Sequence, residues 1–329
     1  MRIHIYSTHP HDRQTLIASL IQAGHQVTSS TTRLESTTLA ESKGCDAVCT
    51  FVCDEVSRAI LHDLREQGVN LILQRAAGTD NIDLAAAREL GMAVAHVPEY
   101  SPHAVAEHAV ALLLSLNRHI HQAYQRMQQA NFSLDGLLGF DLHGKTVGVI
   151  GMGRIGQCFA AIMQGFGCHV LAYDPAAAPA QHMAGVNYET LETVWTASDV
   201  LSLHCPLRPE TYHLVNAELL ACTRPRALLI NTSRGPVVDT AAVLAALRSE
   251  ALGGYAADVY EGEACVFFRN CSECGYDDPL LNDLLHEPSV LLTPHQAFFT
   301  AEALTSIAST TLDNITVFST GQRSANFLA

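Results

Sequence analysis

A glycine-rich turn between an apolar run and a helical stretch restricts the fold of this chain more than any other feature. Gly151-Met-Gly-Arg-Ile-Gly156 directly follows the apolar run at residues 145–150, and Asp174 ends the next apolar run. Glycines at these positions permit a tight turn that a pyrophosphate can approach, and the helix that begins there offers free N–H groups. The pattern indicates a βαβ unit that binds a dinucleotide.

Asp174 distinguishes between the two nicotinamide dinucleotides. A carboxylate at the end of the second strand accepts hydrogen bonds from the ribose hydroxyls of the adenosine half and repels a 2′-phosphate. We therefore expect NAD(H) rather than NADP(H). A lone glycine-rich motif is weak evidence for a dinucleotide site, but here a strand, a turn, a helix and an acidic residue follow one another in the expected order and spacing.

Apolar runs of strand length alternate with amphipathic helical stretches along the chain, which is typical of βαβ units and parallel sheets. The first series of candidate strands comprises residues 2–7, 26–29, 47–52, 71–73 and 93–97. The second series comprises residues 145–150, 170–174, 200–205, 227–232, 254–258 and 289–293. The expected fold class is therefore α/β, with two Rossmann-like domains built on parallel sheets.

The length of 329 residues is too great for one ordinary core and suits two domains. We expect residues 1–100 to begin a substrate domain, residues 101–298 to form an inserted NAD-binding domain, and residues 299–329 to return to the substrate domain. Hinges are expected near Tyr100 and Phe298. Ser101-Pro102 provides an N-cap and a first-turn proline, so one long helix is expected from there towards Arg126.

The charge balance excludes some partners. Acidic residues outnumber basic ones by 33 to 19, and the formal charge of −14 opposes binding to nucleic acid or to anionic membranes. Without a long apolar stretch or an apolar signal core, we expect a cytoplasmic protein that does not contact membranes. Only 16% of the residues are charged, below the ~25% typical of soluble domains. Together with the long apolar helix after Ser101, this favours a homodimer or a homotetramer.

The ten cysteines are expected to be reduced thiols, because they are diluted in a long chain without a secretion signal. Cys265, Cys271 and Cys274 form the one group with a Cys-x-x-Cys pair. No fourth ligand stands at the spacing of a zinc finger. We therefore expect surface thiols in an insertion loop and no metal, with a metal site as the alternative.

Three side chains of complementary chemistry follow apolar runs of the second series. They are Arg234 in Asn-Thr-Ser-Arg-Gly, Glu263 in Asp-Val-Tyr-Glu-Gly-Glu, and His295 in Thr-Pro-His-Gln. A guanidinium grips a carboxylate with two hydrogen bonds, an imidazole transfers a proton near neutral pH, and a neighbouring carboxylate holds that imidazole charged. Because ligands bind beyond the carboxyl ends of parallel strands, we expect the three to meet in one cleft. Reduction of a small 2-keto acid by hydride transfer needs all three.

These motifs, in this order and spacing, resemble the D-isomer-specific 2-hydroxyacid dehydrogenases over essentially the whole chain. Within that family the chain is most similar to the bacterial fermentative D-lactate dehydrogenases, through Val97-Pro-Glu-Tyr-Ser-Pro102, Ala106-Glu-His-Ala109 and Leu203-His-Cys-Pro-Leu207. The resemblance implies a nucleotide-binding domain inserted into a flavodoxin-like substrate domain. It also implies that Arg234 binds the substrate carboxylate, that His295 is the acid/base, and that Glu263 is its charge partner.

The resemblance further implies a set of binding residues. Arg154 and Ile155 would contact the pyrophosphate beside Gly151, Gly153 and Gly156, and Asp258 would meet the nicotinamide amide. The residues expected to line the cofactor channel are Cys205, Pro206, Thr211, Thr232 and Ser233. Ala77, Gly78 and the Tyr100 hydroxyl would bind the substrate together with Arg234 and His295. Arg208 stands where many relatives carry threonine, which puts the local cofactor contacts in doubt.

The implied reaction is the reduction of pyruvate to D-lactate by NADH. A glyoxylate/hydroxypyruvate reductase or a branched 2-keto acid reductase of the same family would keep the same three residues, so the preferred 2-keto acid stays open. An NAD(H)-sensing binding protein with this fold is the alternative from a different class. Neither the choice between dimer and tetramer nor allosteric control follows from the sequence.

Overall fold

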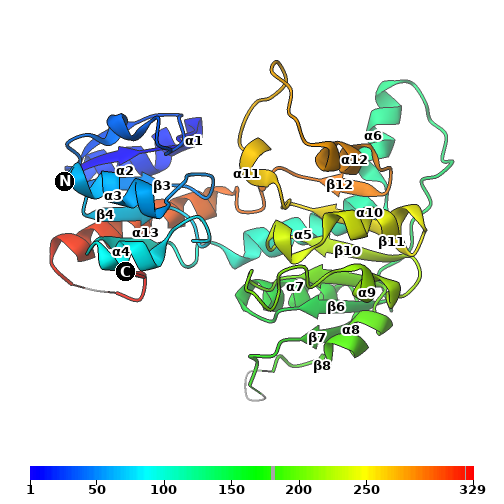
Figure 1. Cartoon of the computed structure of the whole chain (residues 1–329). Helices are drawn as coiled ribbons and strands as arrows, with labels where there is room; N and C mark the ends of the chain where they lie inside the picture. The colour runs from blue at the N-terminus through cyan, green and yellow to red at the C-terminus, as the bar shows by residue number, and fades with distance from the viewer. Residues whose placement is uncertain (179–181, 323) are drawn as a thin grey trace. The chain divides into compact units, whose positions relative to one another are not determined.

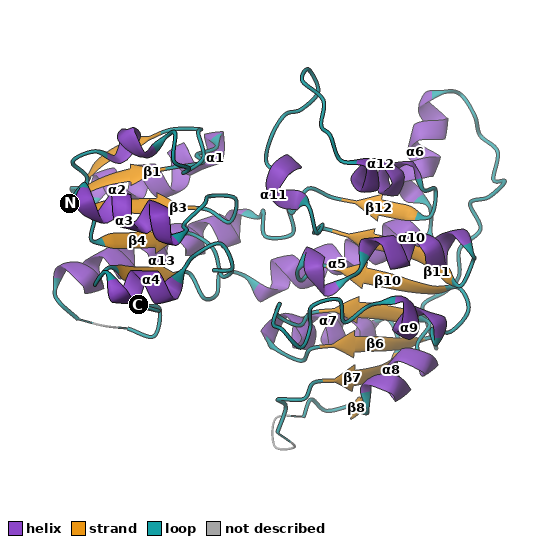
Figure 2. Cartoon of the chain, in the orientation of Figure 1, coloured by secondary structure: helices purple, strands orange, loops and turns teal. Residues whose placement is uncertain are grey.

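The computed structural model describes residues 1–178, 182–322 and 324–329, and the chain divides into two compact units. Unit 1 comprises Met1–Ser101 and Phe298–Ala329, and unit 2 comprises Pro102–Ala297. The corresponding boundaries expected from the sequence are at residues 100 and 298. Each unit is an α/β structure with helices on both faces of one parallel sheet (Figures 1 and 2).

Unit 1 is built on a five-stranded sheet in the order β2-β1-β3-β4-β5, which is the flavodoxin-like order. The central strands β3 and β4 are buried along their whole length, because helices cover both faces of the sheet. The five strands are β1 (Arg2–Ile5), β2 (Gln26–Ser29), β3 (Ala47–Thr50), β4 (Leu71–Gln74) and β5 (Ala93–His96).

Alternate residues of these strands point to opposite faces and fill two cores. Val48 and Ile72 pack into the core under α3 and α4, whereas Cys49 and Leu73 pack into the core that includes Ile315 of α13. The last helix of the chain therefore completes the core that the first residues begin. The helical segments of unit 1 are α1 (Pro10–Asp12), the π-helix η1 (Arg13–Ile17), α2 (Ala18–Gln22), the 3-10 helix η2 (Leu39–Ser42), α3 (Arg58–Glu66), α4 (Leu84–Glu89) and α13 (Ala301–Ser319).

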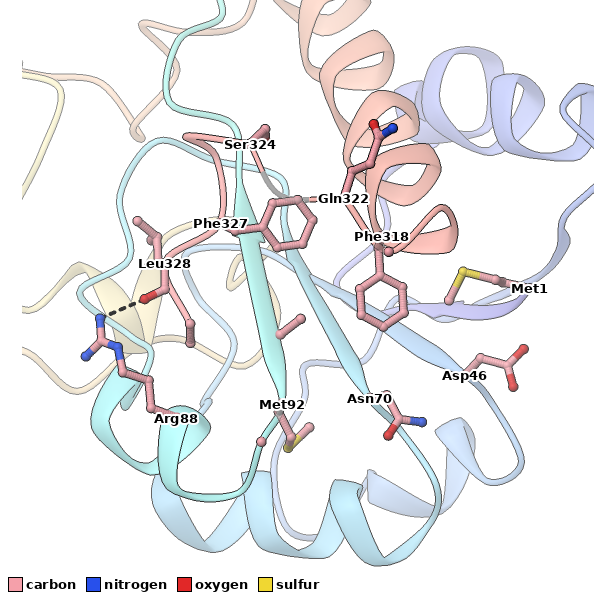
Figure 3. Close-up of a pocket in the computed structure, with 14 residues that line it drawn as sticks. Met1, Asp46, Asn70, Arg88, Met92, Phe318, Gln322, Ser324, Phe327 and Leu328 are labelled. Atoms are coloured by element: carbon pink, nitrogen blue, oxygen red, sulfur yellow. Dashed lines mark hydrogen bonds between the residues drawn. The ribbon is translucent and has the colours of Figure 1, made fainter.

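The final residues of the chain lie along the free edge of β5. The Leu328 N–H donates to the Val94 carbonyl at 2.8 Å, and the His96 N–H donates to the Asn326 carbonyl at 3.0 Å. This segment borders a cavity of about 780 Å³ at the amino ends of the strands, whose lining includes Met1, Asp46, Asn70, Phe318 and Phe327 (Figure 3). The cavity thus lies at the opposite edge of the sheet from the carboxyl ends, where parallel sheets bind their ligands.

Unit 2 is built on a seven-stranded parallel sheet in the order β12-β11-β10-β9-β6-β7-β8. Strand β6 pairs with both β7 and β9, so the strand order reverses beside it, as in dinucleotide-binding folds. The strands are β6 (Thr146–Ile150), β7 (His169–Tyr173), β8 (Val186–Tyr188), β9 (Val200–Leu203), β10 (Ala227–Asn231), β11 (Leu252–Ala257) and β12 (Val290–Leu292).

Two apolar cores cover the faces of the second sheet. Leu113 of α5 and Phe159 of α7 belong to one core, and Trp195, Val243 and Leu281 belong to the other. The helical segments of unit 2 are α5 (Pro102–Asn117), α6 (Ile120–Gln128), α7 (Arg154–Gly165), α8 (Leu191–Ala197), α9 (Ala217–Ala221), the 3-10 helix η4 (Gly235–Val237), α10 (Thr240–Arg248), α11 (Glu263–Val266) and α12 (Pro279–His286). None of the helices in the described part of the chain has the length and hydropathy needed to cross a membrane.

The expectation of one continuous helix from Ser101 towards Arg126 is wrong. The helix α5 ends at Asn117, and His119 adopts a left-handed backbone with φ of 50° before α6 begins. The Asn117 side chain donates to the Phe140 carbonyl at 2.8 Å and accepts from its N–H at 3.0 Å. These two bonds fix the helix end to a returning segment that a sequence pattern does not reveal.

Candidate active site

The site residues predicted in unit 2 follow the carboxyl ends of its strands (Figure 2). The glycine-rich turn follows β6 and Asp174 follows β7, at the place where the strand order reverses. Arg234 follows β10, Glu263 follows β11 and His295 follows β12. All of them therefore lie at one edge of one sheet.

Two glycines of the turn, Gly151 and Gly156, are required by close contacts, whereas Gly153 is not. Gly151 has a φ of +96°, and a Cβ there would lie 2.8 Å from the backbone nitrogen of Cys205. A Cβ at Gly156 would lie 2.0 Å from the Gly151 carbonyl oxygen, so only glycine lets α7 pack against the turn. At Gly153 no atom of the described residues lies within 4 Å of an added Cβ. The space in front of the first turn of α7 is therefore open to a phosphate group.

The Asp174 carboxylate lies beside this turn. Its Oδ2 accepts a hydrogen bond from the Met152 N–H, and its Oδ1 accepts one from the Ala176 N–H, both at 2.8 Å. The side chain is half-buried. A carboxylate fixed in this way, next to the open helix end, is suited to bind the two hydroxyls of a ribose.

The remaining cofactor candidates differ in how far they are buried. Arg154 is exposed on the first turn of α7, whereas Ile155 packs partly into a core. Burial raises the pKa of Cys205 to about 11, so its thiol is neutral. The Thr211 hydroxyl donates to the Pro206 carbonyl at 2.7 Å and accepts from the Arg208 N–H at 2.8 Å. Both hydrogen bonds of the Thr211 hydroxyl are thus made within its own loop, which leaves the hydroxyl less available to a cofactor than the resemblance implies.

Thr232 and Ser233 are buried directly after β10. The Ser233 hydroxyl donates to the Asn231 side chain at 2.8 Å, but the Thr232 hydroxyl has no hydrogen-bond partner within the described residues. A buried hydroxyl without a partner costs about 1–3 kcal/mol unless a ligand or water supplies one. The open helix end, the fixed Asp174 carboxylate and this hydroxyl together fit a bound dinucleotide.

Backbone contacts hold Arg234 in a defined loop. The Asn231 side chain donates to the Arg234 carbonyl at 3.0 Å, and the guanidinium donates through Nη1 to the Ser233 carbonyl at 2.8 Å. A Cβ at Gly235 would lie 2.1 Å from the Tyr260 carbonyl carbon. Glycine therefore lets the loop of Arg234 lie directly against the loop that leads to Glu263.

Glu263 and His295 form a contact pair. His295 Nδ1 lies 2.8 Å from Glu263 Oε1, and the Glu263 Oε2 accepts from the Tyr260 N–H at 2.9 Å. The His295 side chain is 19% exposed and the Glu263 side chain is 21% exposed, so both remain accessible to a small ligand. Because Nδ1 faces the carboxylate, the other ring nitrogen, Nε2, points away from it and is the atom that can exchange a proton with a substrate.

Asp258 has contacts that the sequence did not indicate. Its side chain is 1% exposed, and its two oxygens accept hydrogen bonds from the Gln296 and Ala297 N–H groups, each at 2.8 Å. Asp258 thus binds the segment that carries His295. No local motif signals these contacts.

Ala77, Gly78 and Tyr100 belong to unit 1. The Gln74 side chain donates to the Gly78 carbonyl at 3.0 Å, and His96 Nδ1 lies 3.1 Å from the Ala77 carbonyl oxygen. These contacts fix the loop after β4 through its carbonyl groups. The Tyr100 ring packs edge-on against Phe298, with ring centroids 6.2 Å apart.

The three cysteines of the insertion do not form a ligand cluster among the described residues. Cys265 and Cys274 are exposed and Cys271 is half-buried. Among the residues that the structure describes, the one group with metal-ligand spacing is His62, Asp63 and Glu66, all exposed on α3. Cys265 lies on α11, whereas Cys271 and Cys274 lie between α11 and α12.

Comparison with known proteins adds independent information. Residues 110–297 match the family model described as D-isomer specific 2-hydroxyacid dehydrogenase, NAD binding domain. The chain is 44% identical to a D-lactate dehydrogenase of Escherichia coli (strain K12) over 328 residues, which cover 100% of both proteins. It is 49% identical to D-lactate dehydrogenase kk1H of Curvularia clavata over 295 residues, or 90% of this chain and 84% of that protein. The solved structure of a pyruvate reductase of Chlamydomonas reinhardtii has a TM-score of 0.92 at 39% identity, covering 99% of this chain and 98% of the other.

Proposed function

Because this chain belongs to the D-isomer-specific 2-hydroxyacid dehydrogenases and is an NAD-dependent oxidoreductase, we propose that it reduces pyruvate to D-lactate. The observation that carries the proposal is the 2.8 Å contact between His295 Nδ1 and Glu263 Oε1 at the carboxyl edge of the sheet. The relatives named D-lactate dehydrogenase and pyruvate reductase support pyruvate as the 2-keto acid.

We assign the binding of the substrate carboxylate to Arg234. Its guanidinium offers two parallel N–H donors, which match the two oxygens of a carboxylate. Its loop is held by Asn231 and lies against the loop that leads to Glu263. Arg234 would therefore orient the keto acid beside the acid/base pair. Ala77, Gly78 and Tyr100 of unit 1 are proposed as further substrate contacts.

We assign proton transfer to His295 Nε2. In reduction, the keto oxygen gains negative charge as the carbon accepts hydride, and a protonated imidazole within hydrogen-bond reach neutralises that charge. Glu263 holds the ring by Nδ1 and thereby fixes the direction of Nε2. In oxidation of the hydroxy acid the same nitrogen accepts the hydroxyl proton.

We assign cofactor binding to the turn Gly151–Gly156, Asp174 and the residues after β9 and β10. The dihydronicotinamide of bound NADH supplies the hydride. The first turn of α7 offers N–H groups to the pyrophosphate, and the carboxylate of Asp174 binds the ribose hydroxyls and disfavours NADPH.

The test is the rate of NADH oxidation with a panel of 2-keto acids: pyruvate, glyoxylate, hydroxypyruvate and 2-ketoisocaproate. We expect the highest kcat/KM with pyruvate. A higher value with a larger or smaller acid would assign the chain to another reductase of the family. Binding of NADH without turnover of any acid would favour an NAD(H)-sensing protein instead.

We propose further that the protein is a homo-oligomer, through the second part of the segment in which one long helix was expected. The apolar residues of α5 are largely buried within unit 2, so that helix does not provide a free apolar face. Half of the exposed large apolar side chains among the described residues lie instead on α6 and on residues 129–141. Their exposed fractions range from 53% for Ile120 to 91% for Leu138, and the others are Tyr124, Met127, Phe132 and Leu134. We refer to this set as the α6 arm.

Exposure of this many large apolar side chains in one segment is typical of a protein interface. A second copy of the chain is the proposed occupant, because the low charged fraction of 16% already indicates a large buried surface. Sedimentation equilibrium should show a dimer or a tetramer, and Leu134→Glu with Leu138→Glu should produce monomers. A wild-type monomer would contradict the proposal.

A further inference from the structure

The carboxylate of Asp258 closes a ring of hydrogen bonds around residues 293–297, the segment that carries His295. Its Oδ1 accepts from the Thr293 hydroxyl at 2.6 Å and from the Gln296 N–H at 2.8 Å. Its Oδ2 accepts from the Ala297 N–H at 2.8 Å. The Asp258 carboxylate thus binds both ends of the segment, with His295 between them, and we refer to it as the anchor.

His108 of α5 extends this anchor. Its Nε2 lies 3.0 Å from the Thr293 hydroxyl oxygen and 3.4 Å from Asp258 Oδ1. The Thr293 hydroxyl has one hydrogen, which it donates to Asp258, so towards His108 it can only accept. Nε2 of His108 must therefore carry a proton. His108 is presented by a helix whose neighbouring residues Ala106 and Ala109 are fully buried, so its position is fixed by the core.

The segment needs such an anchor because His295 has an unfavourable backbone conformation. Its φ is 54°, in the left-handed region, and its N–H donates to the carbonyl of Thr293 at 3.0 Å. A non-glycine residue held there costs about 1–3 kcal/mol and persists only when the surrounding contacts impose it. Without the anchor, the segment would relax and the imidazole would move relative to Glu263.

We propose that His108 and Thr293 are positioning residues that act through Asp258 to hold His295 in the geometry for proton transfer. The proposal rests on the proposed function, because it presupposes that His295 exchanges a proton with the substrate. It adds two residues outside the acid/base pair and the cofactor turn, one of them on a helix far from β12 in the sequence.

Two matched pairs of variants test the proposal. Thr293→Val removes the hydroxyl at nearly constant volume, whereas Thr293→Ser keeps it. His108→Leu removes the donor, whereas His108→Gln keeps an N–H near the position of Nε2. The control is Thr196→Val in α8, where an exposed threonine hydroxyl donates to the Glu192 carbonyl at 2.8 Å.

A displacement of about 1 Å at a catalytic group can cost about a hundredfold in rate, so we expect Thr293→Val and His108→Leu to lower kcat for pyruvate about ten- to a hundredfold. The dissociation constant of NADH, from the fluorescence of the bound cofactor, should change less than about twofold. The solvent isotope effect on kcat should rise, because proton transfer becomes slower. The Ser and Gln variants should recover most of the lost kcat, and Thr196→Val should match the wild type.

The outcomes separate this inference from the proposed function. A wild type that turns over pyruvate, with Thr293→Val and His108→Leu at full kcat, would overturn the inference alone. Equal losses in NADH affinity and turnover would also overturn it, since the anchor would then serve the cofactor. A wild type without turnover of any 2-keto acid would overturn the proposed function and this inference with it. If Thr293→Val does not fold, as shown by its thermal unfolding, the His108 pair alone decides.

Discussion

His295 Nδ1 lies 2.8 Å from Glu263 Oε1, although the two residues follow different strands and are 32 positions apart in the chain. The second oxygen of Glu263 accepts a hydrogen bond from the Tyr260 N–H at 2.9 Å, so the orientation of the carboxylate does not depend on the imidazole alone. The ring is thereby turned with Nε2 away from the anion. This relationship defines the proton donor of the proposed reaction.

Replacing Glu263 by Gln should lower the kcat of pyruvate reduction at least about tenfold. The reason is that the imidazole loses the carboxylate that fixes the orientation of its ring through Nδ1. The measurement is kcat at saturating pyruvate and NADH. Glu261→Gln is a matched control, because Glu261 also contacts a histidine, His213, at 2.6 Å, yet has no part in proton transfer. Identical kcat values for Glu263→Gln and the wild type would argue against the assigned role.

Replacing Arg234 by Lys should raise the KM for pyruvate about a hundredfold, because lysine keeps the charge but loses the planar pair of donors. The dissociation constant of NADH should stay nearly constant, since Arg234 is assigned to the substrate. Arg248→Lys is the control, because Arg248 forms an exposed ion pair with Asp283 at 2.8 Å. If pyruvate and NADH were weakened to the same degree, Arg234 would belong to the cofactor site.

Replacing Asp174 by Asn should change the choice of cofactor. Its carboxylate is held by the Met152 and Ala176 N–H groups beside the glycine-rich turn. Loss of its charge should weaken NADH binding about tenfold and remove the repulsion of a 2′-phosphate. The ratio of kcat/KM for NADPH to that for NADH should therefore rise. An unchanged ratio would show that Asp174 does not contact the ribose.

The partly buried ring of His204 predicts a loss of stability in acid. Its Nε2 contacts the Ser202 hydroxyl at 2.9 Å, while its Nδ1 is buried without a partner among the described residues. Burial lowers the pKa of His204 from 6.5 to about 3. The unfolded chain therefore takes up a proton near pH 6.5 that the folded chain does not bind until about pH 3. The stability contributed by the neutral ring is present above pH 6.5 and falls as the pH decreases through that window.

The slope expected from one such group is at most about 1.4 kcal/mol per pH unit. It can be measured as the free energy of unfolding in urea at about pH 7.5 and about pH 5.5. His204→Gln should reduce the difference between the two values, whereas His169→Gln, at an exposed position, should not. Equal differences in the wild type and His204→Gln would show that the ring is not buried as the structure has it.

The sequence predicted the sheets better than the ends of helices, for a physical reason. Strands β3 and β4 are buried on both faces, so their residues form unbroken runs that are largely apolar. Strand β8 was missed, because only one of its three residues is fully buried and no such run exists. The break between α5 and α6 depends on a contact between Asn117 and Phe140, and local periodicity does not contain that information.

The same distinction holds in the candidate site. Glu263 and His295 stand in motifs, and the structure brings them together. His108 and Thr293 are 185 positions apart, so their contact follows from the packing of α5 and not from any spacing in the chain. Two of the three donors to Asp258 are backbone N–H groups, which carry no residue-specific signal, and the third is the Thr293 hydroxyl, 35 positions away in the chain.

We propose that NADH delivers hydride to one face of the keto carbon of pyruvate while His295 donates a proton to the keto oxygen, so that one enantiomer, D-lactate, is formed. The most direct test of this proposal is to incubate the wild type with pyruvate and NADH, to measure NADH consumption by absorbance, and to resolve the lactate formed by chiral chromatography. We predict that D-lactate accumulates in step with the NADH consumed, and that His295→Asn abolishes both signals while still binding NADH. Formation of L-lactate, or no pyruvate-dependent loss of NADH, would contradict the account.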